Sequence, residues 1–259
     1  MSGEVFTSIQ EDLVIIHNNI KNQLSIKAGH ISNYAHLEFS PMDNILRPAI
    51  VLGVARLYNC KATEVIALGS IVQFIFMASQ IHKRIPESST VANLADPRDG
   101  NQFPVLVGDY LYGKFFTTLC DANIVKYLRP LSEIIGKIHE GGILSLMNPT
   151  SLSNSEEATQ LVEKIIRLET AELCAGAARL AGDLAGASEE EQQGLYDFGL
   201  NIGMVHGFLQ RKCFSKQSLK YSQQAVEALE NLPCQLTKGV LEHLVHAVSL
   251  KDAGIRKVV

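Results

Sequence analysis

Few residues in this chain have the types and spacing that support chemistry on their own. His243 and His246 stand three apart on an expected helix, whereas helical metal pairs more often stand four apart, and no third ligand is indicated. Asp96 and Asp99 are separated by a proline, a pattern typical of a solvated turn. Gly141-Gly142 interrupts an expected helix and lacks the Lys-Ser/Thr that completes a phosphate-binding loop. Structural roles are favoured for all of them.

A second candidate is the stretch SQIHKRIPE at residues 79–87, where Lys83 and Arg84 follow a long apolar run. Cations at the carboxyl end of a helix are favoured by the helix dipole. On this interpretation Lys83 and Arg84 are solvated charges. Only a resemblance to a protein family gives Lys83 and Arg84 a possible role in a functional site.

Composition limits the class of protein. The 259 residues are 46% hydrophobic and 19% charged, which excludes a disordered chain. A net charge of −4 gives no electrostatic footprint for nucleic acid. The acidic, polar start MSGEVFTSIQEDL is neither a signal nor a transit peptide. Five scattered cysteines without CxxC spacing indicate reduced thiols, so a cytoplasmic protein is expected.

Hydrophobic periodicity predicts helices almost throughout and essentially no sheet. The expected ranges are 6–24, 45–59, 63–84, 104–121, 124–147, 156–185, 189–212, 216–230 and 235–250. Ser188 and Glu191 form a predicted capping box. The apolar run at 65–81 contains Ser70, Gln73 and Ser79, so a buried core helix is expected there and no transmembrane segment. The fold class predicted is all-α, one bundle of roughly ten or more helices over residues 1–259.

Three blocks then resemble the trans-isoprenyl diphosphate synthases, the polyprenyl synthetase family. LRPAIVLGVARLYNC at 46–60 is similar to the family's second long helix, which begins at the end of a GKRLRP motif. FPVLVGDYLYGKFF at 103–116 is similar to VLxGDYLxxxAF. Residues 169–204, ETAELCAGAARLAGDLAGASEEEQQGLYDFGLNIGM, follow the family pattern KTAxLFxxxxxLGAxLAGAxxExxxxLxxFGxxLGxAFQ. The resemblance implies the isoprenoid synthase fold.

The resemblance also implies a reaction that this chain is poorly equipped to perform. In the family, an allylic diphosphate ionises while magnesium ions held by two DDxxD motifs stabilise the departing diphosphate. The first motif aligns with Lys83, Arg84, Ile85, Pro86 and Glu87, of which only Glu87 is acidic. The second aligns with Gln210, Arg211, Lys212, Cys213 and Phe214, with no carboxylate. Magnesium is therefore expected only in a catalytic partner.

Other reactive positions of the family also differ. The lysine of GKRLRP is Asn44, the diphosphate-binding histidine aligns with Phe76, and the lysine of the KT pair is Glu169. The second arginine of GKRLRP is kept as Arg47, the single substrate-binding residue expected. An alternative interpretation places Arg47 at a helix start, where it pairs with a nearby acid.

The resemblance therefore implies a non-catalytic subunit of a heteromeric polyprenyl diphosphate synthase. Its expected partner is a catalytic synthase subunit, or a second copy of itself, bound through the helix at 104–121. The apolar residues that suggest this interface are Val105, Leu106, Tyr110, Leu111, Phe115, Phe116 and Leu119. The alternative is a stand-alone protein that binds a prenyl diphosphate or another lipid without transferase activity, with Arg47, Lys83 and Arg84 as anion-binding groups.

Overall fold

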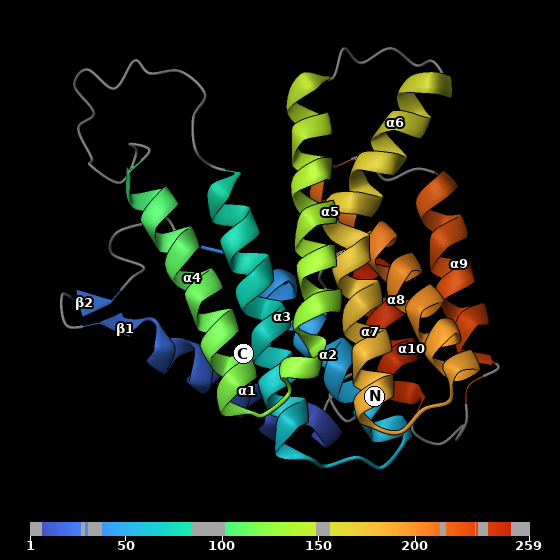
Figure 1. The fold of residues 1–259 in the computed structure, drawn as a ribbon. Coiled ribbons are helices and arrows are strands. Elements are labelled where there is room, and N and C mark those ends of the chain that lie inside the picture. Colours follow the sequence, from blue (N-terminus) through green and yellow to red (C-terminus); the bar gives the residue numbers. More distant parts are fainter. Residues whose placement is uncertain are drawn as a thin grey trace.

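Helices make up nearly all of the chain that the computed structural model describes, which is residues 7–26, 29–30, 38–83, 102–148, 156–212, 216–230, 232 and 238–249. The N-terminal part holds α1 (Thr7–Gln23), β1 (Ser25–Ile26), β2 (Gly29–His30), α2 (Pro41–Leu57) and α3 (Thr63–His82). Then follow α4 (Gln102–Asp121), the 3₁₀ turn η3 (Val125–Tyr127), α5 (Leu128–Met147), α6 (Glu156–Ile166) and the π-helical turn η4 (Arg167–Ala171). The chain continues with α7 (Glu172–Leu184), α8 (Glu189–Gln210), α9 (Lys216–Glu230) and α10 (Gly239–Ser249). This bundle (Figure 1) confirms the predicted all-α fold class.

The start of α2 shows how local sequence fixes a helix end. Periodicity predicted a start at residue 45, but the helix begins at Pro41. The Ser40 hydroxyl accepts a hydrogen bond from the Asp43 backbone N–H at 3.1 Å, which satisfies one of the free donors of the first turn. Pro41 costs nothing there because its missing N–H would have no helical partner. This early start brings Asp43 into the helix and toward the functional site.

The predicted capping box at the start of α8 is confirmed. The Ser188 backbone N–H donates to Glu191 Oε2 at 2.8 Å, and the Glu191 N–H donates to Ser188 Oγ at 3.3 Å. The two residues thus satisfy each other's free backbone donors and fix where α8 begins. The carboxyl end of this long helix reaches the functional site.

The core helix is α3. It is the one helix among the described residues that is long and apolar enough to cross a membrane, and 78% of its most apolar window is buried within the protein. It packs against α1, α2, α4 and α7, and Figure 1 shows it inside the bundle. The interpretation of residues 65–81 as a buried core helix agrees with this arrangement.

Helices α7 and α8 approach each other closely. A Cβ added to Gly199 would lie 2.4 Å from the Cys174 carbonyl oxygen, so only glycine fits at this crossing. The 169–204 block, which carries the strongest family pattern, is therefore an α7–α8 pair held in tight backbone contact. This contact fixes the carboxyl end of α8 relative to η4.

Two local features differ from the sequence prediction. Residues Ser25–Ile26 and Gly29–His30 form a two-stranded antiparallel pair, the β structure present in the described residues. Helix α5 also runs through Gly141 and Gly142 without the predicted interruption. Gly141 is needed there because a Cβ would lie 2.8 Å from Glu169 Cγ, so it allows α5 to lie against η4.

Candidate functional site

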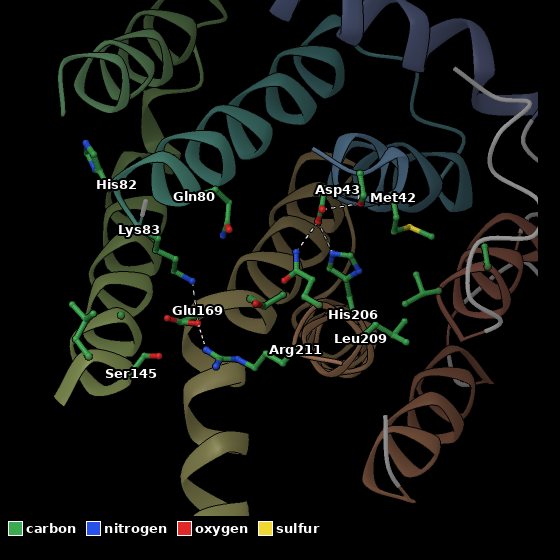
Figure 2. A pocket seen from close by; sticks show the side chains of 17 residues that line it. Met42, Asp43, Gln80, His82, Lys83, Ser145, Glu169, His206, Leu209 and Arg211 are labelled. Carbon is green, nitrogen blue, oxygen red and sulfur yellow. Dashed lines mark hydrogen bonds and ion pairs between the residues drawn. The ribbon is translucent and has the colours of Figure 1, made fainter. Parts of the chain in front are cut away.

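A cavity with a volume of about 830 Å³ lies where several helix ends meet. Its walls come from the start of α2, the end of α3, the second half of α5, η4, the end of α8 and α10. We name it the charged cavity, after the ionisable side chains that line it: Asp43, His82, Lys83, Glu169, His206 and Arg211. Figure 2 shows Lys83, Glu169 and Arg211 meeting from separate helices and Asp43 meeting His206, whereas His82 lies apart.

Glu169 is held between two cations in this cavity. Its Oε2 atom lies 3.0 Å from Lys83 Nζ and 2.6 Å from Arg211 Nη2. Lys83 comes from the end of α3 and Arg211 from the end of α8, so one carboxylate joins both helices to η4 (Figure 2). Glu169 is 8% exposed, and π-helical turns such as η4 occur frequently at functional sites. By the resemblance, these three positions belong to the two DDxxD motifs and the KT pair.

The electrostatics of this arrangement follow from burial. Burial lowers the pKa of Lys83, and the neighbouring Glu169 carboxylate partly offsets that effect. Arg211 and the buried Arg47 are also close enough for charge to matter, and both lower the pKa of Lys83 further. The Lys83–Glu169–Arg211 cluster therefore combines one carboxylate with two cations in a partly dehydrated site.

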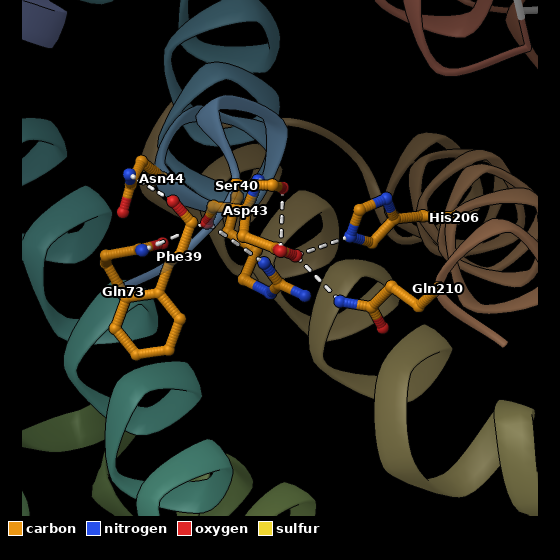
Figure 3. A network of polar contacts seen from close by, with 8 residues as sticks. Phe39, Ser40, Asp43, Asn44, Gln73, His206 and Gln210 are labelled. Carbon is orange, nitrogen blue, oxygen red and sulfur yellow. Dashed lines mark hydrogen bonds and ion pairs between the residues drawn. The ribbon is translucent and has the colours of Figure 1, made fainter. Parts of the chain in front are cut away.

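A second polar network surrounds Asp43 (Figure 3). Asp43 Oδ1 accepts hydrogen bonds from His206 Nε2 at 2.8 Å and Gln210 Nε2 at 2.7 Å. Its Oδ2 atom accepts one from the Ser40 hydroxyl at 2.7 Å. The backbone carbonyl of Asp43 accepts a further bond from Gln73 Nε2 at 3.0 Å. The network thus ties the start of α2 to both α3 and the last turns of α8.

These contacts determine the charge states of the network. Burial alone would raise the pKa of Asp43, but the hydrogen bond from His206 and the positive charge of Arg47 outweigh it and lower that pKa. Burial lowers the pKa of His206, and the nearby Arg47 acts in the same direction. Asp43 is therefore an ionised carboxylate, and a neutral His206 donates its Nε2–H to it.

Arg47 does not line the charged cavity. Its side chain is 1% exposed, and it lies in the second turn of α2 rather than at the helix start. Its Nη1 donates to the backbone carbonyl of Asp43 at 3.3 Å, and its guanidinium lies over the Phe76 ring. Its Nε atom has no hydrogen-bond partner in the described part of the protein. The predicted pairing with a nearby acid is present as a charge interaction with the Asp43 carboxylate, while the direct contacts of Arg47 are with the Asp43 carbonyl and the Phe76 ring.

A second buried carboxylate, Glu172, lies one turn after Glu169. It accepts hydrogen bonds from Lys137 Nζ at 2.9 Å, Arg167 Nε at 3.1 Å and the Tyr196 hydroxyl at 2.8 Å. Burial would raise its pKa, but these three partners together lower it. Glu172 is therefore a charged link between α5, η4, α7 and α8, next to the cavity.

The structure brings together only part of the predicted site. Lys83, Gln210 and Arg211 line the charged cavity, whereas Arg84 and Glu87 lie outside the described residues, as do Asp96 and Asp99. Sequence reasoning missed Asp43 and His206 as a pair, because they are separated by 163 positions and neither was singled out as a site residue, although Asp43 takes the first position of the GKRLRP alignment. It identified Glu169 only as a lost lysine. By the resemblance, residues 83 and 211 change from aspartate to a cation, and residue 169 changes from lysine to glutamate. These opposite changes in charge were the available signal that the three side chains meet.

The residues of this cavity do not fit a magnesium cluster. Its lining residues within the described part of the chain include two carboxylates, Asp43 and Glu169, and both are already bound by donors or cations. The described residues contain no group of three or more His, Cys, Asp or Glu side chains able to hold a metal ion. Lys83 and Arg211 would repel a divalent cation placed beside Glu169.

Comparison with known proteins defines the family. The polyprenyl synthetase family model matches residues 31–208. The chain is 29% identical over 196 residues to octaprenyl diphosphate synthase of Escherichia coli, an alignment that covers 74% of this chain and 60% of that protein. It is 28% identical over 212 residues to a prenyl transferase of Synechocystis, covering 78% of this chain and 63% of the relative. The chain therefore spans about 60% of the length of these relatives.

Solved structures show the same fold. Decaprenyl diphosphate synthase from Rhodobacter capsulatus superposes with a TM-score of 0.80 at 19% identity, covering 96% of this chain and 98% of that one. The small subunit of geranyl diphosphate synthase from Antirrhinum majus has a TM-score of 0.67 at 19% identity, covering 93% and 99%. The chain belongs to the polyprenyl synthetase family.

Proposed function

We propose that this chain is a non-catalytic subunit of a heteromeric polyprenyl diphosphate synthase in isoprenoid biosynthesis, located in the cytoplasm. The observation that carries the proposal is the Glu169 carboxylate, bound at 3.0 Å by Lys83 and at 2.6 Å by Arg211. These cations stand at positions where, by the resemblance, the family places magnesium-binding aspartates. The Lys83–Glu169–Arg211 cluster occupies that place with contacts internal to the chain.

The chemistry of the family explains why this exchange matters. Departure of a diphosphate from an allylic carbon requires concentrated positive charge at the leaving group. Lys83 and Arg211 carry positive charge, but Glu169 already neutralises part of it. The described residues of the cavity also do not fit magnesium, so the charge needed for ionisation belongs to a partner subunit.

Two comparisons support assembly with a partner, though each concerns another protein. One solved structure of the same fold is the small subunit of a geranyl diphosphate synthase, and another is a heterotetrameric geranyl pyrophosphate synthase. The curated relatives with higher identity are named as synthases or transferases. The charge exchange around Glu169 is what favours the subunit role for this chain.

Helix α4 is the proposed contact surface. Leu111, Phe115 and Leu119 are buried, and α4 packs mainly against α3, so these residues belong to the core. Of the seven apolar residues that suggested an interface, these three therefore pack into the core, and Phe115 at 0% exposure is not an interface position. Leu106 at 57% and Phe116 at 49% remain exposed, together with Val105. The exposed side of α4 thus presents Val105, Leu106 and Phe116 to a partner, with the exposed Asp109 on the same face.

The deciding experiment is co-expression with candidate catalytic synthases, followed by affinity capture and a transferase assay. The proposal expects the isolated chain to give no condensation of isopentenyl diphosphate with an allylic diphosphate above background. It also expects capture of a catalytic homologue whose yield, stability or product length changes in the complex. Turnover by the single chain, removed by a substitution at Glu87 or Asp99, would contradict the proposal.

The volume of the charged cavity favours one second candidate, a stand-alone protein that binds a prenyl diphosphate or another lipid. A space of about 830 Å³ with Lys83 and Arg211 on its wall is large enough for an anionic amphiphile. Tight binding of a prenyl diphosphate by the isolated chain, without magnesium and without capture of any synthase, would favour this candidate over the subunit role.

A further inference from the structure

A second cavity lies between α1, α2, α3 and strand β2, away from the charged cavity. It has a volume of about 460 Å³, and none of its described lining residues also lines the charged cavity. We name it the α1 cavity. Figure 1 shows α1 at the edge of the bundle, beside the strands β1 and β2. Different residues of α2 line the two cavities. Met42 and Asp43 line the charged cavity, and Asn44, Ile45 and Pro48 line the α1 cavity.

The inner wall of the α1 cavity is apolar. Leu13, Ile16 and Ile20 from α1 and Met77 from α3 are all buried side chains. Their spacing on α1 is that of a single helix face, so the cavity follows this helix lengthwise. A space of this kind and size suits a hydrocarbon chain, which would supply the contacts that an empty apolar cavity lacks.

The mouth of the cavity is basic. His17 and Lys21 stand one turn apart on α1 and are exposed, and His30 from β2 also lines the opening. Among the residues that the structure describes, the lining includes no aspartate or glutamate. A basic rim beside an apolar interior is complementary to a molecule that has a negative headgroup and an apolar tail.

One buried polar group also lines this cavity. Gln73 is 2% exposed, and its Nε2 donates to the Asp43 carbonyl, while its Oε1 has no hydrogen-bond partner in the described part of the protein. Buried side-chain oxygens are usually bonded, so this wall differs from simple core packing. Gln73 thus lies between the α1 cavity and the backbone carbonyl of Asp43.

We propose that the α1 cavity binds a single-chain anionic amphiphile, with its tail between Leu13, Ile16, Ile20 and Met77 and its headgroup beside His17 and Lys21. The site is separate from the one that the proposed function uses. It requires neither a catalytic partner nor magnesium. The result of its test is therefore independent of whether the chain is a synthase subunit.

The test compares three probes that share a twelve-carbon tail, namely dodecanoate, dodecanol and dodecyltrimethylammonium, titrated calorimetrically into the full chain below their aggregation concentrations. Dodecanoate is expected to bind about tenfold more tightly than dodecyltrimethylammonium, with dodecanol between them. Lys21→Gln should weaken dodecanoate binding about threefold, an effect that added salt reduces, and leave dodecanol unchanged. Lys61→Gln, an exposed lysine outside this cavity, is the matched control and should change neither. Equal affinity for all three headgroups overturns the proposal, and so does the absence of binding.

Location is tested separately. Met77→Trp fills the inner wall and should abolish dodecanoate binding. Since that variant risks misfolding, a dodecanoate analogue with a photoreactive tail is cross-linked to the unmodified chain and the labelled peptide is identified. Labelling of α1 or of the middle of α3 supports the proposal. Labelling at Gln210 or Arg211, or binding that Lys83→Gln removes and Lys21→Gln does not, places the probe in the charged cavity and overturns it.

Discussion

The guanidinium of Arg47 lies over the ring of Phe76, with 3.6 Å between Arg47 Cζ and the ring centroid. By the resemblance, these are the positions of a diphosphate-binding arginine and a diphosphate-binding histidine in the family. Here the two side chains contact each other instead. Burial lowers the pKa of Arg47, and the face of the aromatic ring supplies part of the electrostatic partner that a buried cation requires. The single cation kept at these positions is thus part of the packed interior.

This contact predicts a difference between two phenylalanines on α3. Phe76→Leu should destabilise the protein more than Phe74→Leu, by about 1 kcal/mol in the free energy of unfolding, because only Phe76 also stabilises a buried cation. Both side chains are nearly fully buried, so the loss of packing is similar. Urea denaturation of the two variants measures the difference. Equal losses would show that the ring contributes packing alone.

The Lys83–Glu169–Arg211 cluster predicts a stability loss when its carboxylate is removed. Glu169→Gln leaves two partly buried cations without their anion, which should cost about 2 kcal/mol in the free energy of unfolding. Glu133→Gln is the control, because Glu133 pairs with Arg129 on the exposed face of α5 and such pairs contribute about 0.5 kcal/mol or less. Chemical denaturation at neutral pH compares the variants.

Coupling within that cluster gives a second check. In the Lys83→Met background, Glu169→Gln should cost less than in the unmodified chain, because one of the two cations that it leaves without a partner is already gone. If the losses in the free energy of unfolding from the two substitutions are additive, the Lys83–Glu169 contact contributes nothing to stability.

The same cluster predicts how the cavity responds to metal. Crystals soaked with magnesium and a non-hydrolysable diphosphate should show no ordered magnesium cluster between the end of α3 and the end of α8. Lys83 and Arg211 repel a divalent ion there, and Glu169 is already bound by both. A well-ordered cluster of ions at this place would overturn the non-catalytic interpretation.

His206 predicts a dependence of stability on pH. Burial holds its pKa below the ordinary value of 6.5, so the unfolded chain takes up this proton first as the pH falls. The stabilising contribution is therefore present above pH 6.5 and is lost as the pH falls below it. His139, whose pKa is also lowered by burial, adds to the same trend. Asp43 acts in a separate window, below the ordinary carboxylate value of 3.8.

The measurement is the free energy of unfolding between pH 7.5 and pH 5, by urea denaturation at each pH. The unmodified chain should lose stability across this range. His206→Gln keeps a hydrogen-bond donor for Asp43 but cannot titrate, so its curve should be flatter. A slope unchanged by the substitution would assign the titration to other groups.

Sequence reasoning recovered most of the fold for a physical reason. Long amphipathic helices such as α8 carry their own periodicity and caps, so their limits can be read locally, and Ser188 marked the start correctly. The start of α2 was placed too late because Asp43 lies before the apolar repeat, and the helix start is marked instead by the Ser40 cap, which accepts from the Asp43 N–H. The pairing of Glu169 with Lys83 and Arg211 was not predicted, since ion pairs between distant segments leave no periodic signal.

The last prediction concerns the exposed face of α4. Phe116→Asp places a charge among the exposed apolar residues of α4, Val105 and Leu106, so a dimer formed through this helix should dissociate, because interfaces of this type do not tolerate a buried charge. Leu219→Asp, at a comparably exposed apolar position on α9, is the control and should leave the assembly intact. Light scattering measures the mass of each variant alone and after co-expression with a catalytic homologue. A fully buried position such as Phe115 would not serve, because a charge there disrupts the core rather than the interface. An unmodified chain that stays monomeric and that no catalytic homologue captures would contradict the subunit proposal and leave the lipid-binding function in its place.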